Sequence, residues 1–546
     1  SLDSPGGEHA PTPLGGANAR EREPVRARLT QGVHTAGSVR GSSSHQQNPF
    51  LILCDRDATE DAGRCWGMAL VYSGNFLAST EYTQFHETRM TMGIHPFHFA
   101  WLLQPGETFT APEAAMVFSA RGLGHMSRMF HRAIRLNLCR GPWKDARRPI
   151  LINNWEATLF HFDAEKLYSI AQAASRVGVE MMVMDDGWFG ERNDDFGGLG
   201  DWNVNEKKLP GGLAPLAGRI GSLGMKFGLW VEPEMVNENS DLYRAHPDWA
   251  FQVPGRPVTR GRYQLVLDLS RPEVRQYILD HLCATLKSAD ISYLKWDMNR
   301  SLTDVWSAAL PPERQGEVYH RFVLGVYEIL EALHREFPDL LIEGCSGGGG
   351  RFDCGMLYYT PQIWCSDNTD AMDRLRIQYG TSFCYPCASM GAHVSAVPNG
   401  LTHRSTPLHT RGVVAAAGTF GYELDLNELT AAELVEVSAQ IAGFRTYWDL
   451  VMRGDYYRIS DPFRQEVPFC AWMHVSPDRD RALVGLVQTQ RHANPVRPLL
   501  RLKGLDPDRN YRINGQVYGG DELMYAGLAL PFLDECEAVQ YYIESV

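Results

Sequence analysis

The stretch "ISYLKWDMNR" (residues 291–300) decides the fold class, because it is an apolar strand that ends at charged residues. The run "ISYL" has the branched and aromatic side chains of a buried strand, and charged residues appear from Lys295 onward. Side chains alternate along a strand, so Lys295 and Asp297 lie on one face and Trp296 on the other. The pattern therefore places an ammonium and a carboxylate together at a strand end.

Six further segments have the same form, and helices lie between several of them. One helix, 163–178, is expected to start with Asp163 as N-cap and to stop at Gly178, and a later one to start at a capping box of Ser270 and Glu273. Alternating strands and helices predict a parallel sheet, and about eight units favour a closed (β/α)8 barrel over an open sheet. The other predicted strands are 149–155, 180–186, 226–232, 264–270, 340–346 and 362–368.

Antiparallel β-structure is predicted on both sides of the barrel. Short apolar runs broken by Gly, Asp and Pro occupy 49–120, and similar runs return after about residue 450. The predicted domains are a partial N-terminal β-sandwich (1–140), the catalytic (β/α)8 barrel (141–448) and a C-terminal antiparallel β-sandwich (449–546). Residues 1–48 are rich in Gly, Pro, Ser and Arg, so they are expected to be a disordered arm or the remnant of a domain that lacks its first part.

The composition of the 546 residues excludes several classes of partner. With a net charge of −13 and 44% hydrophobic residues, the chain is not expected to bind nucleic acid or an anionic membrane. Eleven cysteines without zinc-type spacing, together with the absence of a signal-peptide pattern, predict a cytoplasmic protein with reduced thiols. There is no HExxH motif and no close set of His and Asp ligands, so neither a metal nor a cofactor is expected. A neutral small molecule is the expected partner.

The ends of the predicted strands repeat one chemistry, carboxylates with tryptophans. In a barrel these ends meet at one mouth. Carboxylates accept hydrogen bonds from sugar hydroxyls and an indole covers the apolar face of a pyranose, so a sugar is the expected ligand. A single Asp at a strand end is more often a turn former or a helix cap, and it is the repetition that favours function. The residues concerned include Asn154, Trp155, Asp185, Asp186, Trp188, Trp230, Glu232, Glu234, Asp268, Lys295, Asp297, Cys345, Ser346 and Asp367.

Two of these carboxylates are the candidates for opposite protonation states. Glycoside hydrolysis needs one ionised carboxylate and one protonated carboxyl group. Lys295 is expected to keep Asp297 ionised by direct charge attraction, which makes Asp297 the candidate nucleophile. Asp367 follows an apolar strand near Trp364 and is the candidate acid, although "SDNTD" is also typical of an Asx-turn or a helix cap.

The glycine run in "CSGGGGR" (345–351) lacks the lysine and the Ser or Thr of a phosphate-binding loop. Glycines at this position allow the backbone to approach a ligand closely. Cys345 is either a compact contact at the strand end or a small buried hydrophobe.

Six motifs in the same order resemble the α-galactosidases of glycoside hydrolase family 36. They are "MDDGWFGERNDD" (184–195), "GLWVEPEMVN" (228–237), "LKWDMNR" (294–300), "EGCSGGGGRFD" (343–353), "WCSDNTDAMDRLRIQYG" (364–380) and "GTFGYELDL" (418–426).

This resemblance implies a retaining α-galactosidase that acts on small α-galactosides of the melibiose and raffinose type, with Asp297 as nucleophile and Asp367 as acid/base. It implies that Trp155 lies at the rim of the sugar pocket, and that the sugar-binding residues are Asp185, Asp186, Trp230, Arg262, Lys295, Cys345 and Gly348. Galactose as the sugar follows from the resemblance alone.

Two departures from the family pattern leave other interpretations open. The chain is expected to start partway through the family's N-terminal β-sandwich, and a homotetramer is expected if that domain is complete. The segment "PNGLTHR" (398–404) differs from the related motif PNHQTGR, and it predicts no consequence. The alternative functions are a galactosyl transglycosylase of the raffinose-synthase type and an inactive, truncated galactoside-binding protein.

Overall fold

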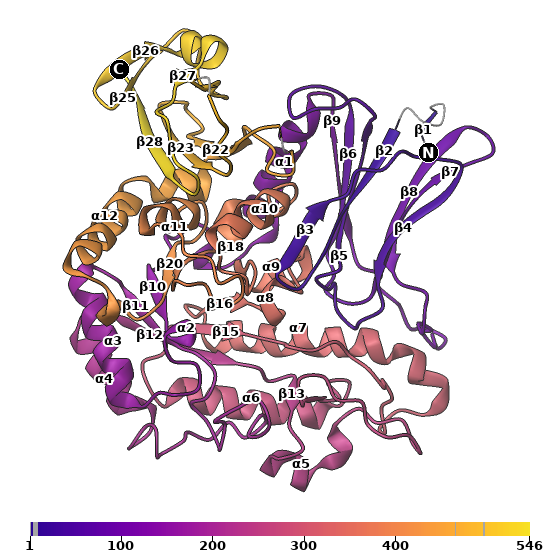
Figure 1. The fold of residues 1–546 in the computed structure, drawn as a ribbon. Helices are drawn as coiled ribbons and strands as arrows, with labels where there is room; N and C mark the ends of the chain where they lie inside the picture. The colour runs from indigo at the N-terminus through magenta and orange to yellow at the C-terminus, as the bar shows by residue number, and fades with distance from the viewer. Residues whose placement is uncertain (1, 4–8, 465, 495–496) are drawn as a thin grey trace.

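The computed structural model describes residues 2–3, 9–464, 466–494 and 497–546. Figure 1 shows a barrel of parallel strands and helices between two antiparallel sheets formed by the N-terminal residues and a smaller β-structure formed by the C-terminal residues. In these four ranges, no helix combines the length and the apolar character needed to cross a membrane. The predicted barrel with β-sandwiches on either side is confirmed.

The barrel closes through one interrupted strand. β18 pairs with β17 and β19 pairs with β20, and Ala392 alone separates β18 from β19, so the two segments act as a single eighth strand. All neighbouring strands of the barrel pair in parallel. The strands are β10 (Leu151–Asn153), β11 (Met181–Met184), β12 (Lys226–Val231), β15 (Tyr293–Trp296), β16 (Leu341–Gly344), β17 (Gln362–Trp364), β18 (Met390–Gly391), β19 (His393–Ser395) and β20 (Gly421–Glu423).

Amphipathic helices cover the barrel. In α3 the predicted ends are confirmed, because the Asp163 side chain accepts a hydrogen bond from the amide of Lys166 and Gly178 adopts a φ of 100°. Its apolar face, with Leu167 and Ile170, is buried. The helices are α1 (Gly122–Ala133), α2 (Trp155–Thr158), α3 (Ala164–Val177), α4 (Leu213–Ser222), α5 (Asp241–Ala245), α6 (Pro272–Lys287), α7 (Val318–Glu336), α8 (Ser346–Gly349), α9 (Cys354–Tyr359), α10 (Ala371–Thr381), α11 (Leu408–Ala415) and α12 (Ala431–Arg453).

Two predictions for 264–273 are wrong. The segment 264–270 is not a barrel strand, because β14 (Leu265–Val266) pairs antiparallel with β13 (Met235–Val236). The predicted capping box is absent, because α6 follows Arg271 with Pro272 in its first turn. The Ser270 hydroxyl donates instead to Asp268 at 2.5 Å. Apolar alternation does not distinguish a barrel strand from a short ribbon beside the barrel.

The N-terminal residues form two antiparallel sheets, and the expectation of a disordered arm is wrong for 9–48. Residue 1 and residues 4–8 lie outside the described ranges. One sheet contains β1 (Leu2–Asp3), β4 (Gly32–Ser38), β7 (Phe76–Tyr82) and β8 (Glu87–Ile94). The other contains β2 (His9–Ala17), β3 (Arg20–Pro24), β5 (Gln47–Asp55), β6 (Cys65–Leu70) and β9 (Ala114–Ser119).

The five-stranded N-terminal sheet packs directly on the barrel. The Asn48 amide nitrogen donates to the carbonyl of Phe352 at 2.7 Å, and its side-chain oxygen accepts from the Tyr385 hydroxyl at 2.7 Å. Ser43 donates to the buried Asp353 at 2.6 Å. These buried contacts join the sheet to the segments that follow β16 and β17, which carry candidate site residues.

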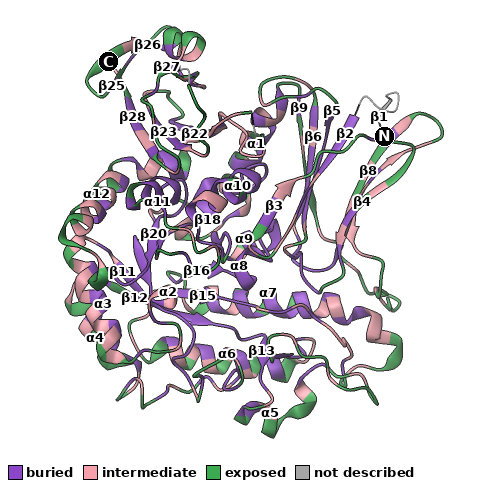
Figure 2. Ribbon diagram, in the orientation of Figure 1, coloured by how far each residue is buried: buried purple, intermediate pink, exposed green. Residues whose placement is uncertain are grey.

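The C-terminal residues form the predicted antiparallel β-structure with its own core. Met473, Val484, Tyr511 and Ile543 are among its buried side chains, and Figure 2 shows buried residues along β22, β23 and β28. The six-stranded sheet contains β21 (Asp455–Arg458), β22 (Phe469–Val475), β23 (Arg481–Gln488), β28 (Ala538–Ser545), β25 (Asn510–Ile513) and β26 (Gln516–Gly519), beside a pair of strands, β24 (Leu499–Leu500) and β27 (Leu528–Ala529).

Candidate active site

A cavity of about 530 Å³ lies at the carboxyl ends of the barrel strands. In a barrel this is the end at which loops from separate strands bring reactive groups together. Eight of the ten predicted site residues line the cavity. They are Trp155, Asp185, Asp186, Trp230, Arg262, Lys295, Asp297 and Asp367.

Four donors surround the Asp297 carboxylate, which follows β15. The backbone amides of Met298 and Gly347 donate to Oδ1 at 2.8 Å each, and Trp230 Nε1 and Asn299 Nδ2 donate to Oδ2 at 3.1 and 2.8 Å. Burial acts to raise the pKa of Asp297, but the charge of Lys295 and these hydrogen bonds outweigh it and hold the pKa below its ordinary value. Asp297 is therefore ionised at neutral pH.

Asp367, which follows β17, has the opposite environment. Burial and the nearby charge of Asp297 raise its pKa to about 7. Within the described part of the chain, no donor forms a hydrogen bond with the Asp367 carboxyl group, whereas Asp297 accepts four. This carboxyl group can hold a proton near neutral pH and is free to share it with a ligand.

The charge of Lys295 lowers the pKa of Asp297, as predicted, but the direct ion pair of Lys295 is with a different carboxylate. Its Nζ donates to Asp185 Oδ2 at 2.9 Å, so the direct ion pair is with Asp185, and Lys295 acts on Asp297 through charge. Asn153 also donates to Asp185 Oδ2 at 2.6 Å. A strand pattern places Lys295 and Asp297 on one face but does not show which carboxylate from another strand the long lysine side chain reaches.

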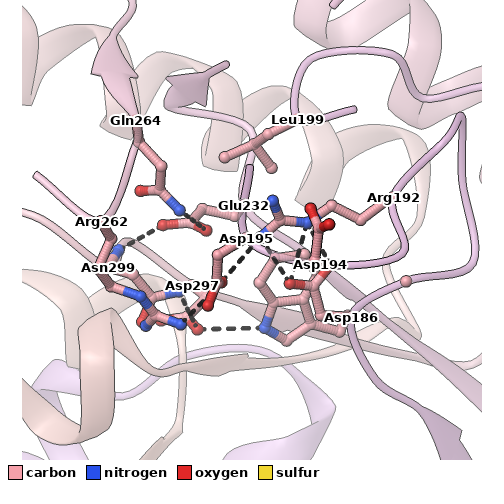
Figure 3. Close-up of polar contacts among 12 residues, drawn as sticks. Asp186, Arg192, Asp194, Asp195, Leu199, Glu232, Arg262, Gln264, Asp297 and Asn299 are labelled. Carbon is pink, nitrogen blue, oxygen red and sulfur yellow. Dashed lines mark hydrogen bonds and ion pairs between the residues drawn. The ribbon is translucent and has the colours of Figure 1, made fainter. Parts of the chain in front are cut away.

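Asp186 is held by Arg192, whose NH2 group lies 2.9 Å from Asp186 Oδ2. Burial raises the pKa of Asp186 to about 6, so this group is mostly ionised at neutral pH. Figure 3 shows Arg192 between Asp186 and the acidic residues 194 and 195, and Arg262 beside Asp195. Arg262 NH2 lies 3.3 Å from Asp195 Oδ1.

Cys345 and Gly348 lie behind the cavity wall and do not line it. Cys345 is 2% exposed. Gly348 has a φ of 77°, and a Cβ there would lie 2.2 Å from the backbone nitrogen of Asp367 and 2.9 Å from its carboxyl group. The glycine therefore allows the turn after β16 to touch the residue that carries the candidate acid.

Sequence reasoning missed several polar residues of the site. Figure 3 shows Glu232 between Gln264 and Asn299. Gln264 Nε2 donates to Glu232 at 3.0 Å. The backbone amide of Asn299 also donates to Glu232. Burial and the charge of Asp297 raise the pKa of Glu232 to about 8. Glu232 was recognised only as one of many strand-end carboxylates, and nothing in its spacing distinguished it.

Other missed residues come from distant segments. Asn18 lines the cavity although it lies between β2 and β3 of the N-terminal sheet, and no pattern in its neighbourhood indicates this. Glu156 follows the predicted rim residue Trp155, and burial together with the charge of Glu423 raises its pKa to about 8. The segment 398–404, which differs from the family motif, supplies part of the cavity wall, with Pro398, Asn399, Gly400 and Leu401.

The arrangement can perform acid-assisted displacement at an acetal carbon. It offers one ionised carboxylate, one carboxyl group that holds a proton near neutral pH, and further carboxylates and indoles that suit sugar hydroxyls and ring faces. Among the described residues, no group of three or more His, Cys, Asp and Glu side chains is placed to hold a metal ion.

Comparison with known proteins also indicates a glycoside hydrolase, and the matches extend along most of the chain. The melibiase family matches residues 108–454, and the N-terminal and C-terminal domains of glycosyl hydrolase family 36 match residues 1–104 and 469–543. Alpha-galactosidase AgaA of Geobacillus stearothermophilus is 54% identical over 97% of this chain and 73% of that protein. Alpha-galactosidase Mel36A of Lactobacillus acidophilus is 46% identical over 98% of this chain and 73% of that protein.

Solved structures extend the similarity to the fold. The crystal structure of the Geobacillus enzyme has a TM-score of 0.98 to this chain at 53% identity, and the match covers 100% of this chain and 76% of that one. Variants of that enzyme have been solved in complex with raffinose and with stachyose. The chain therefore belongs to the α-galactosidases of glycoside hydrolase family 36.

Proposed function

We propose that the protein hydrolyses terminal α-linked galactose from oligosaccharides by double displacement, with Asp297 as nucleophile and Asp367 as acid/base. The observation that carries this proposal is the opposite displacement of two pKa values in one cavity, lowered at Asp297 and raised to about 7 at Asp367. Retaining glycosidases need this pair of protonation states.

In the first step Asp297 Oδ attacks the anomeric carbon while Asp367 gives its proton to the departing oxygen. This forms a β-linked galactosyl-enzyme and releases the leaving sugar. In the second step Asp367, now ionised, takes a proton from water, which attacks the same carbon and releases galactose with its α-configuration retained. This requires the two carboxyl groups to be about 5–5.5 Å apart, because a longer separation of about 6.5–9.5 Å leads to inversion.

The remaining cavity residues hold the sugar in this proposal. Asp185 and Asp186 offer carboxyl oxygens as acceptors for two hydroxyl groups, and Lys295 and Arg262 supply donors. Trp230 already donates to Asp297, so its ring lies beside the reacting carbon, and Trp155 lies at the rim. Gly348 acts from behind the wall, where it allows the turn after β16 to approach Asp367, and Cys345 is the buried residue that precedes this turn.

Raffinose and stachyose, which the Geobacillus variants bind, are the proposed type of substrate.

We also propose that the chain assembles into a homotetramer. β9 is an edge strand of its sheet, and Met116 and Phe118 on it are 64% and 51% exposed. We also infer a reducing, cytoplasmic location, since all eleven cysteines are unpaired and nine of them are buried.

Hydrolysis of raffinose followed by ¹H NMR of the first-formed anomer tests the function. The expected product is α-galactose, which mutarotates afterwards, together with sucrose. First-formed β-galactose would contradict double displacement. Galactosyl transfer to a second sugar in place of release would favour the transglycosylase, and binding of galactose without turnover would favour an inactive binding protein. Asp297→Asn is the matched variant that should bind galactose but not turn over raffinose.

A further inference from the structure

We infer that Arg22, from the N-terminal sheet, is a positioning residue that holds the candidate nucleophile and the candidate acid/base in register. This inference rests on the proposed function, because it concerns the geometry of the same two carboxyl groups. Arg22 lies on β3, which Figure 1 shows beside α10 and close to α8 and α9 of the barrel. Its side chain is not in contact with the cavity, so it would act through the backbone that carries Asp297 and Asp367.

The guanidinium of Arg22 joins three separate barrel segments. Nη1 donates to the carbonyl of Gly349 at 3.1 Å, in the turn after β16, and Nη2 donates to the carbonyl of Cys365, directly after β17. Nε donates to the hydroxyl of Thr381 at 2.6 Å, at the end of α10. The planar group also lies over the ring of Phe352, 4.9 Å from its centroid.

Each of the two candidate catalytic groups rests on a segment that Arg22 holds. Gly347 donates its amide to Asp297 Oδ1 at 2.8 Å, and Gly348 packs against Asp367 so closely that a Cβ would overlap its backbone. Asp367 itself lies two residues after Cys365. The guanidinium therefore spans the turn that stabilises the nucleophile and the strand end that carries the acid.

Two neighbours of Arg22 hold the same turn from the N-terminal side. Asn18 Nδ2 donates to the carbonyl of Gly347 at 2.8 Å, and His45 Nε2 lies 2.6 Å from the same oxygen. Burial lowers the pKa of His45, so its imidazole is neutral at neutral pH and acts as a hydrogen-bond donor. The hydrogen bonds that Asn18, Arg22 and His45 make to this turn all end at backbone oxygens.

The burial and acceptors of Arg22 indicate a geometric role. Arg22 is 2% exposed. Its hydrogen bonds to two carbonyls and a hydroxyl are joined by a longer one from Nη2 to the Cys365 sulfur at 3.6 Å, and none of these acceptors is a carboxylate. A charge taken out of water without an ion pair is costly, and such a group is retained where its fixed fork of donors specifies an arrangement. Lysine presents its three donors from a single nitrogen on a flexible stem, so it cannot reproduce the rigid fork by which Arg22 Nε, Nη1 and Nη2 reach acceptors in three directions.

Movement of the turn should affect proton donation more than substrate binding. The acid must reach the leaving oxygen within hydrogen-bond distance, so a small displacement of Asp367 weakens its help. Substrates with a good leaving group need little protonation, whereas sugars leave only when protonated. A misplaced acid therefore slows raffinose more than an activated aryl α-galactoside.

The experiment compares wild type with Arg22→Lys and Arg22→Gln on two substrates, raffinose and 2,4-dinitrophenyl α-galactoside. The matched control is Arg26→Gln, because Arg26 also donates to three backbone carbonyls, at Asp55, Arg56 and Ala58, and all three belong to the N-terminal residues, not to the barrel. Thermal unfolding of each variant gives the folded fraction. Thr381→Val removes one of the three acceptors with little change in shape and serves if the Arg22 variants do not fold.

We expect kcat/KM, which reports the first step, to fall at least about tenfold more for raffinose than for the dinitrophenyl substrate in both Arg22 variants, with the ratio unchanged in Arg26→Gln. Thr381→Val should shift the ratio in the same direction by a smaller factor. An equal loss on both substrates, or none, would overturn the inference while leaving hydrolysis by the wild type intact. Absence of hydrolysis in the wild type would instead reject the proposed function, so the two failures are distinguishable.

Discussion

The pH dependence of raffinose hydrolysis follows from the two displaced pKa values. The form that reacts has Asp297 ionised and Asp367 protonated. The pKa of Asp367 is raised to about 7, so its protonated fraction falls from about 0.9 at pH 6 to about 0.1 at pH 8. Moving the pH from 6 to 8 should therefore lower kcat/KM about tenfold.

The acidic limb of the pH profile depends on Asp297. The pKa of Asp297 is held below its ordinary value of 3.8, so kcat/KM should stay nearly constant between pH 5 and 6 and fall only at lower pH. The whole profile therefore has a plateau that ends near neutral pH and extends far to the acidic side.

The assay is initial-rate kcat/KM for raffinose at constant ionic strength across this range, with the folded fraction followed by circular dichroism. The control is Asp367→Asn measured on 2,4-dinitrophenyl α-galactoside, which needs no acid in its first step and should show no fall near neutral pH. A wild-type profile that stays flat to about pH 9, or a fall that persists in Asp367→Asn, would refute the assignment of Asp367 as the acid.

Three other outcomes follow from the same contacts. Asp297→Gly should lose turnover, and with added azide it should release β-galactosyl azide, which NMR detects. Release of α-galactosyl azide would contradict a nucleophilic role. Asp367→Asn should raise the free energy of unfolding in urea at pH 7.5 by up to about 4 kcal/mol. The reason is that folding raises the pKa of Asp367, so its contribution to stability is fully present only below the ordinary pKa of an aspartate and is lost as the pH rises through about 7. Equal stability of wild type and variant at pH 7.5 would contradict this. Lys295→Met should raise the pKa of Asp297 and move the acidic fall of kcat/KM to higher pH, and an unmoved limb would show that hydrogen bonds alone keep Asp297 ionised.

The barrel could be predicted because its strands are short apolar runs with polar ends, a local pattern. The strand formed by β18 and β19 could not, since Ala392 interrupts it and its two halves are two and three residues long. The segment 264–270 has the same alternation as a barrel strand and was placed wrongly, because pairing with β13 depends on a residue far away in sequence.

The site shows a similar division. Asp297 and Asp367 could be identified because both follow apolar strands, and Arg262 because of the family resemblance. The ion pair of Lys295 with Asp185 joins β15 to the end of β11, which lies beyond β12 in the barrel, and no spacing reveals it. Asn18 belongs to a segment whose composition suggested disorder, since Gly and Pro residues there conceal buried positions such as Leu14.

The asymmetry between the two carboxyl groups depends on hydrogen-bond donors as well as on the neighbouring lysine. Lys295 bonds Asp185 directly, and its charge acts on both Asp297 and Asp367. What differs is that Asp297 accepts four hydrogen bonds, from Trp230, Met298, Asn299 and Gly347, while Asp367 is buried with none from the described residues.

Hydrogen bonds to an ionised form lower its pKa, and burial without them raises it, so the same cavity yields one base and one acid. Two of the four donors, the Met298 amide and the Asn299 side chain, belong to the segment that directly follows β15. The donor from Gly347 is different, because its position depends on a glycine-rich turn that Asn18, Arg22 and His45 hold from the N-terminal sheet. The protonation state of Asp297, a barrel residue, thus depends on a sheet that is separate from the barrel in sequence.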